Sequence, residues 1–145
     1  MKVAFIKSTE DKKSMDFTEP FLLYNDQQPL QWKYKDTSHG EEDFRRAVFA
    51  QWEDQKLVIK ITCNDFTFPH RVEVWQKTAA AYLAMGYYCP QIVVNRNGNL
   101  AETVEYEGRL CVVYAEEFSR YKAADQFEER IWDNFLANRD ALAQI

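Results

Sequence analysis

A lysine inside an apolar stretch is the first residue of this sequence that could do chemistry. Lys60 stands among Val58, Ile59 and Ile61. An unpaired ammonium group is costly to bury, so Lys60 must either face solvent or meet a compensating charge. The candidates for that charge are Glu73, on the helix expected to follow, and a bound phosphate. The spacing alone leaves the solvent-facing and the partnered interpretations open.

Other combinations of reactive residues lack the spacing that catalysis requires. His39 and His70 have no Ser or Cys at a recognised motif spacing, which favours surface or capping roles for both. A phosphotransferase catalytic loop needs a His, then an Asp as base, then an Asn that holds a metal. In 39–41 the acid is a Glu and the Asn position is filled by Arg46. The segment 138–140 fails in the same way, and no catalytic residue is predicted.

Length and composition favour one globular domain, 1–145. A chain of 145 residues that is 46% hydrophobic is long enough to bury a core. The net charge of -5 gives no general attraction to nucleic acid or anionic membranes, so neither is expected as a partner. No apolar run approaches the span of a bilayer. Cys63, Cys89 and Cys111 lack the spacing of zinc ligands, which predicts reduced thiols, no metal site and a soluble cytoplasmic protein.

The periodicity predicts an α+β domain: an antiparallel sheet of about five strands, one long packed helix and a C-terminal helix. Strands are expected at 30–35, 44–52, 56–62 and 109–115, with further extended segments at 91–96 and 101–106. The long helix should begin at Pro69 and stop at Gly86. Asn-Gly at 97–98 predicts a hairpin, and Glu-Gly at 107–108 a second turn.

The chain after residue 119 is expected to form a C-terminal helix with an apolar stripe. Phe127, Ile131 and Phe135 recur at helical spacing, with Trp132 and Leu136 beside them. A helix that exposes such side chains would be stabilised by docking against a second copy. A homodimer through this helix is therefore predicted.

The order of these segments resembles the N-terminal lobe of the protein-kinase-like fold, in particular the aminoglycoside phosphotransferase and choline kinase-like family. Three stretches carry the resemblance: Leu57-Val58-Ile59-Lys60-Ile61, the helix from Pro69 that ends in Met85-Gly86-Tyr87-Tyr88-Cys89-Pro90, and the strand Leu110-Cys111-Val112-Val113-Tyr114-Ala115-Glu116-Glu117-Phe118. The resemblance covers roughly residues 30–125, and the lobe itself would be residues 30–118. Residues 1–29 would then be an N-terminal extension, and 119–145 a hinge and C-terminal helix.

The resemblance implies a nucleotide site, with ATP and Mg²⁺ as cofactors. Lys60 matches the family's strand lysine, which holds the α- and β-phosphates. Its carboxylate partner on the helix would be Glu73, although the distance back from Gly86 suits Gln76 equally well. The other nucleotide-binding residues that the resemblance implies are Ser38, His39 and Gly40 in the phosphate-covering loop, Val58 and Val113 as adenine walls, and the backbone of Ala115, Glu116 and Glu117.

The resemblance also implies that this chain does not catalyse alone. The base and the metal-binding residues of the family lie in a C-terminal lobe, and the sequence holds no candidate for any of them. We therefore expect the nucleotide-side lobe of a phosphotransferase, whose phosphate acceptor the sequence does not identify. The alternative is a stand-alone, non-catalytic interaction module that self-associates and binds no nucleotide.

Overall fold

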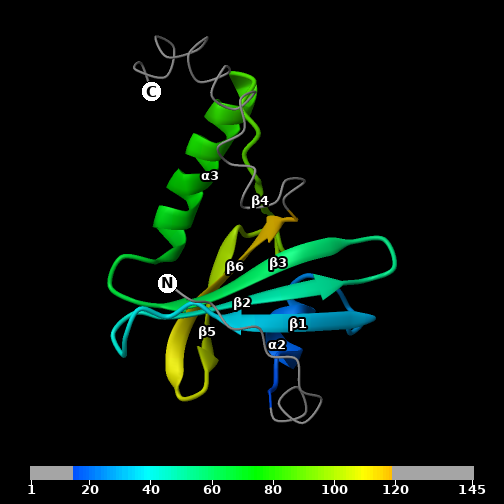
Figure 1. Ribbon diagram of the computed structural model, residues 1–145, viewed down its shortest axis with the longest axis vertical. Coiled ribbons are helices and arrows are strands. Elements are labelled where there is room, and N and C mark those ends of the chain that lie inside the picture. The colour runs from blue at the N-terminus through cyan, green and yellow to red at the C-terminus, as the bar shows by residue number, and fades with distance from the viewer. Residues whose placement is uncertain (1–14, 119–145) are drawn as a thin grey trace.

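The protein folds as an α+β domain around one antiparallel sheet (Figure 1). The computed structural model describes residues 15–118. The sheet has six strands rather than about five, in the order β1-β2-β3-β6-β4, and β5 also pairs with β6. The strands are β1 Gln31–Asp36, β2 Phe44–Gln51, β3 Lys56–Cys63, β4 Ile92–Val93, β5 Ala101–Tyr106 and β6 Arg109–Glu117. The helices are α2 Thr18–Leu22 and α3 Pro69–Ala84. The predicted fold class is confirmed.

The sheet has two faces, which we name after the helix that packs on each. Successive side chains of a strand point to opposite faces. On β3, Ile59 and Ile61 belong to the same buried cluster as Phe21 of α2, so this side is the α2 face. Val58 and Lys60 alternate with them and lie on the other side, the α3 face.

The α2 face carries the main core, which is rich in aromatic rings. Phe17 stacks on Tyr106 at 5.9 Å and meets Trp32 edge-on at 5.2 Å. Val48, Ile59, Ile61 and Val113 are fully buried against these rings. Residues 15–24 are therefore an integral layer of the domain, although the sequence suggested only an extension there.

The α3 face carries a smaller cluster that covers part of the sheet. Val72 of α3 is fully buried against Ile92, Ala101 and Val112, with Trp75 and Tyr114 packed beside them. The strand members of this cluster come from β4, β5 and β6. The C-terminal part of α3 projects past the sheet (Figure 1). Leu83 in this part of the helix is 47% exposed.

The predicted bounds of α3 are confirmed within one residue. Pro69 opens the helix, where its missing N–H has no intrahelical partner to lose. Met85 is the C-cap, and Gly86 follows with φ of 91°, the left-handed conformation that ends helices.

The predicted Asn-Gly hairpin is wrong. Asn97-Gly98 does form a turn, because Gly98 N–H donates to the Asn95 carbonyl at 3.0 Å. The flanking strands, however, do not pair with each other. β4 and β5 both pair with β6, through Val93 opposite Ala115 and Ala101 opposite Tyr114. The segment 94–100 is thus an excursion between two strands that follow the same edge of β6.

The predicted C-terminal helix and the homodimer assigned to it lie outside the described residues. Within residues 15–118, no helix is long and apolar enough to cross a membrane.

Truncation of Ile59 should destabilise the fold far more than truncation of an exposed residue. Ile59 is 0% exposed, so Ile59→Ala removes buried methyl groups and leaves a cavity, which we expect to lower the free energy of unfolding by about 2–5 kcal/mol. Leu110 is 69% exposed, and Leu110→Ala should change it by less than about 0.5 kcal/mol. Urea denaturation of both variants measures the difference. Equal stability of the two would contradict the assignment of the core to the α2 face.

Candidate functional site

Lys60 lies half-buried on the α3 face of β3. The register places it between Ala47 of β2 and Tyr114 of β6. Ala47 is 1% exposed, and Tyr114 packs on Trp75 with ring centroids 6.0 Å apart. Lys60 therefore stands at the border between the part of the face that α3 covers and the part formed by β1, β2 and β3.

The expected ion pair between Lys60 and Glu73 is not formed in the described part of the chain. Glu73 instead pairs with His70, whose Nδ1 lies 3.4 Å from Glu73 Oε2, and both side chains are mostly exposed. The reason is the helical phase. Val72 and Ala79 point to the sheet, and Glu73, one residue after Val72, is turned away by about 100°.

Gln76 is the helix residue that faces the sheet at this level. Its Oε1 accepts the backbone N–H of Ile92 at 2.7 Å, and its Nε2 donates to Gln91 Oε1 at 2.7 Å. Gln91 is held in turn, because its Nε2 donates to the carbonyls of Cys89 and Ala79. The position that the sequence left open between Glu73 and Gln76 thus presents an amide that ties α3 to β4.

The loop between β1 and β2 uses the hydrogen-bond donors of Ser38 and His39 internally. Ser38 N–H donates to Asp36 Oδ1 at 2.8 Å, and its hydroxyl bridges the backbone N–H and carbonyl of Arg45. His39 N–H donates to the Asp43 carbonyl, and Gly40 takes φ of 114° to close the turn. The predicted role of this loop required free N–H groups for phosphates, and those of Ser38 and His39 are already engaged.

The Asp43 carboxylate also serves the loop. It binds Arg45 at 2.8 Å and Asn64 Nδ2 at 2.8 Å, and these hydrogen bonds lower its pKa below the usual value for an aspartate. Acidic charge near the loop is therefore fixed in place.

The segment Ala115–Glu117 is strand, and it pairs with β3 and β4 at the place where the resemblance implied contact with an adenine. β6 continues two residues past the predicted end at 115, between β3 and β4. Ile92 lies opposite Glu116 and Leu57 opposite Glu117, and the Glu117 N–H donates to the Gln91 carbonyl at 3.0 Å.

The two valines assigned to one adenine slot lie on different faces. Val58 is on the α3 face, two positions from Lys60 on the same strand. Val113 is fully buried in the main core on the α2 face. The structure brings Val58 and Lys60 together but separates Val113 from both.

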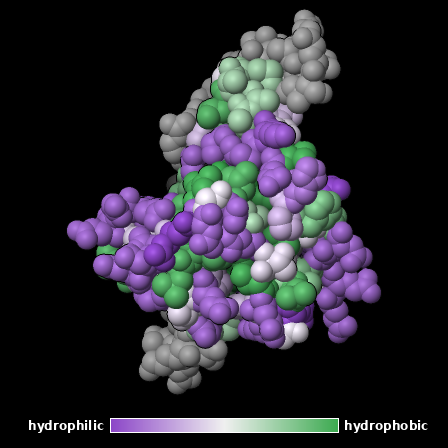
Figure 2. Space-filling model, turned by 180° about the vertical axis from the view of Figure 1, so that it is seen from behind, coloured by the Kyte–Doolittle hydropathy of each residue, from purple (hydrophilic) through white to green (hydrophobic). Residues whose placement is uncertain are grey.

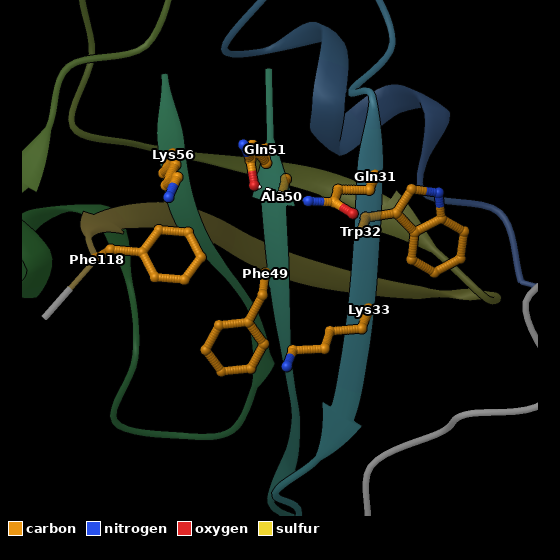
Figure 3. A pocket seen from close by; sticks show the side chains of 8 residues that line it. All are labelled: Gln31, Trp32, Lys33, Phe49, Ala50, Gln51, Lys56 and Phe118. Carbon is orange, nitrogen blue, oxygen red and sulfur yellow. Dashed lines mark hydrogen bonds between the residues drawn. The ribbon is translucent and has the colours of Figure 1, made fainter. Parts of the chain in front are cut away.

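A pocket of about 480 Å³ lies on the α3 face at the end of β1, β2 and β3 (Figure 3). Phe49 and Phe118 supply its aromatic surface, with ring centroids 5.8 Å apart. Phe49 stands opposite Val58 in the register, so the pocket adjoins the Val58–Lys60 segment. The lining residues are Gln31, Trp32, Lys33, Phe49, Ala50, Gln51, Lys56 and Phe118.

Two lysines of β1 lie beside the Phe49 ring. The Nζ atoms of Lys33 and Lys35 lie 5.9 Å and 5.2 Å from its centroid, within cation–π distance. Figure 3 shows the Lys33 side chain extending toward this ring. Burial lowers the pKa of Lys35, and the positive charges of Lys60 and Lys33 lower it further. These three ammonium groups therefore share one region of the face.

The aromatic residues of the pocket and the lysines of β1 were not predicted as site residues. Lys33 and Lys35 lie on the same face of the sheet as Lys60. The available signal was the alternation itself, because the antiparallel order of β1, β2 and β3 sets which residues share a face.

No group of three or more His, Cys, Asp or Glu side chains suited to a metal ion occurs within residues 15–118. The thiols of Cys63, Cys89 and Cys111 are free. Comparisons of the chain with protein-family models, with curated proteins and with solved structures found no match.

Replacement of Gln76 by glutamate should destabilise the protein at neutral pH. Gln76→Glu loses the donor to Gln91 Oε1 and sets a carboxylate against it, which should lower the free energy of unfolding by about 1–3 kcal/mol. Gln91 cannot remove this repulsion by rotating its amide group, because its Nε2 already donates to two carbonyl groups.

The stability lost in Gln76→Glu should be partly recovered at low pH. The introduced carboxyl should have a raised pKa, so the destabilisation is present above that pKa and is lost as pH falls and the protonated group again donates. Glu73→Gln, on the exposed side of α3, is the matched control. Urea unfolding from pH 7 to pH 4 measures both, and a deficit independent of pH would contradict this assignment of Gln76.

Proposed function

We propose that this chain binds a nucleotide on the α3 face of its sheet and serves as the nucleotide-side lobe of a phosphotransferase. The observation that carries this proposal is the juxtaposition of the Phe49–Phe118 pocket with Lys60 and Lys35 on one face. An aromatic surface suits a planar base, and ammonium groups suit phosphates. The resemblance of residues 30–118 to the lobe of small-molecule kinases supports the same function.

The pocket fits the base of a nucleotide better than the backbone of Ala115–Glu117 does. Its volume of about 480 Å³ is within the range of small-molecule sites, roughly 300–1,000 Å³. Phe49 and Phe118 offer ring surface, while the backbone groups of Ala115–Glu117 lie within the sheet between β3 and β4. In this proposal the base contacts the two rings, and the phosphates extend along β3 toward Lys60.

The described residues do not fit a magnesium site. Mg²⁺ takes oxygen ligands such as carboxylates, and no suitable cluster lies within residues 15–118. Phosphoryl transfer needs positioning and neutralisation of phosphate charge. This part of the chain offers only cationic side chains for that task, so we propose binding without catalysis by these residues. A cytoplasmic location, with its supply of nucleotides and reducing conditions for the free thiols, belongs to the same proposal.

ATP binding should be weak and should require Lys60. We expect a dissociation constant of about 1 mM for the full chain at low salt, which corresponds to roughly 4 kcal/mol of binding free energy. Lys60→Met should weaken binding about tenfold or more, because it removes a charge-assisted contact. Lys77→Met, an exposed lysine of α3, is the control for net charge. Isothermal titration calorimetry and Trp fluorescence measure both, and failure of the wild-type chain to bind ATP would exclude the proposal.

A second candidate, an interaction module, is favoured by the exposed apolar side chains of α3. Val74, Tyr82 and Leu83 are 45%, 36% and 47% exposed. Figure 2 shows an apolar area over the end of α3 that lies furthest from the sheet. Grouped apolar side chains of this kind are typical of surfaces that bind another protein or a second copy.

A charge at Leu83 should reduce any self-association through α3. We expect the wild-type chain to show a rising mean mass across a dilution series, and Leu83→Asp to shift this rise to higher concentration by about tenfold, since burying a leucine contributes roughly 1.5–3 kcal/mol. Lys77→Asp, elsewhere on the same helix, is the control. Analytical ultracentrifugation makes the measurement, and a wild-type chain that stays monomeric at high micromolar concentration would argue against this candidate.

A further inference from the structure

Every charged side chain that β1, β2 and β3 place on the α3 face is basic. The register aligns the three strands residue by residue, so the members of the face follow from alternation. They comprise five basic residues and no carboxylate: Lys33, Lys35, Arg45, Lys56 and Lys60. The chain as a whole is acidic, with a net charge of -5. The part of this face formed by β1, β2 and β3 therefore differs in sign from the protein as a whole. Asp43 pairs with Arg45 at its loop end, and Glu116 of β6 lies opposite Val58 at its border.

Lys35 and Lys60 occupy the same row of this face. Lys35 lies opposite Ala47, and Ala47 lies opposite Lys60. Neighbouring strands are about 4.8 Å apart, which sets the two lysine backbones roughly 10 Å apart with only the methyl group of Ala47 between them. Both lysines are half-buried, and their charges are close enough to lower the pKa of Lys35.

The N–H groups of Ser38 and His39, in the loop between β1 and β2, are not available to hold a phosphate. In many phosphate sites the backbone N–H groups of a loop hold the anion. Here the N–H groups of Ser38 and His39 donate to Asp36 and Asp43 within the loop. The N–H groups of these two residues are thus engaged, and the candidate groups for anion binding are the side chains of the strands.

We infer that Lys35 and Lys60 together form a site for a polyphosphate chain, in which each lysine holds a different phosphoryl group. This inference rests on the proposed function and extends it to a residue of β1. Two cations on separate strands match an anion whose charge is spread along a chain, such as the triphosphate of a nucleotide or inorganic tripolyphosphate. A monophosphate carries less charge and offers the pair only one phosphoryl group. The row thus selects ligands by the number of linked phosphoryl groups.

The test compares tripolyphosphate, ATP and AMP as ligands of the full chain at low ionic strength, by isothermal titration calorimetry. The variants are Lys35→Met, Lys60→Met and the conservative Lys35→Arg, with Lys77→Met as the control for net charge. We expect Lys35→Met to weaken tripolyphosphate and ATP about tenfold or more, the loss typical of one charge-assisted contact. It should change AMP binding less than twofold, and Lys35→Arg should retain most of the affinity.

The outcomes separate this inference from the proposed function. If Lys35→Met binds ATP as the wild type does while Lys60→Met does not, the lysine pair is excluded and nucleotide binding stands. If the wild type binds tripolyphosphate through both lysines but ATP no better, the pair stands and nucleotide recognition fails. An equal loss of AMP and tripolyphosphate binding in Lys35→Met would overturn the selection by phosphoryl number. Circular dichroism of each variant establishes that the sheet is intact.

Discussion

The alternation of side chains along β3 constrains both the core and the site. Burying Ile59 and Ile61 under the aromatic layer of α2 forces Val58 and Lys60 to the opposite face. A shift of one residue would place the ammonium group of Lys60 in a core whose members are almost fully buried, which is strongly unfavourable. The stability of the α2 face thus sets the direction in which the site faces.

Local signals predicted most of this fold, because the strands and α3 are defined by short-range patterns. The period of two in β1, the proline that opens α3 and the glycine that ends it are each recognisable within a few residues. The pairing of β4 with β6 is different in kind. It joins Ile92 to Glu116, far apart in the sequence, and no local pattern indicates which edge a two-residue strand will take.

The site was less predictable than the fold, for a physical reason. Lys60 was recognisable because a charge among apolar neighbours conflicts with burial. Phe49 and Lys35 each fit the pattern of their own strand. They could be recognised as site residues only from the register, which sets them beside Lys60. The predicted pairing of Glu73 with Lys60 was wrong for the opposite reason. Glu73 has a suitable charge, but Val72 and Ala79 set the phase of α3 and turn Glu73 away from the sheet.

The source of positive charge on the α3 face bears on what the chain can do chemically. Backbone N–H groups are rigid donors, and a loop that uses them holds phosphates in one geometry. Lysine side chains are flexible and lose conformational freedom when they hold an anion. In the proposed site, Lys35 and Lys60 would therefore attract and retain a polyphosphate without fixing the in-line geometry that phosphoryl transfer requires. Such a surface suits a lobe that recruits a nucleotide and leaves its alignment to groups contributed from elsewhere.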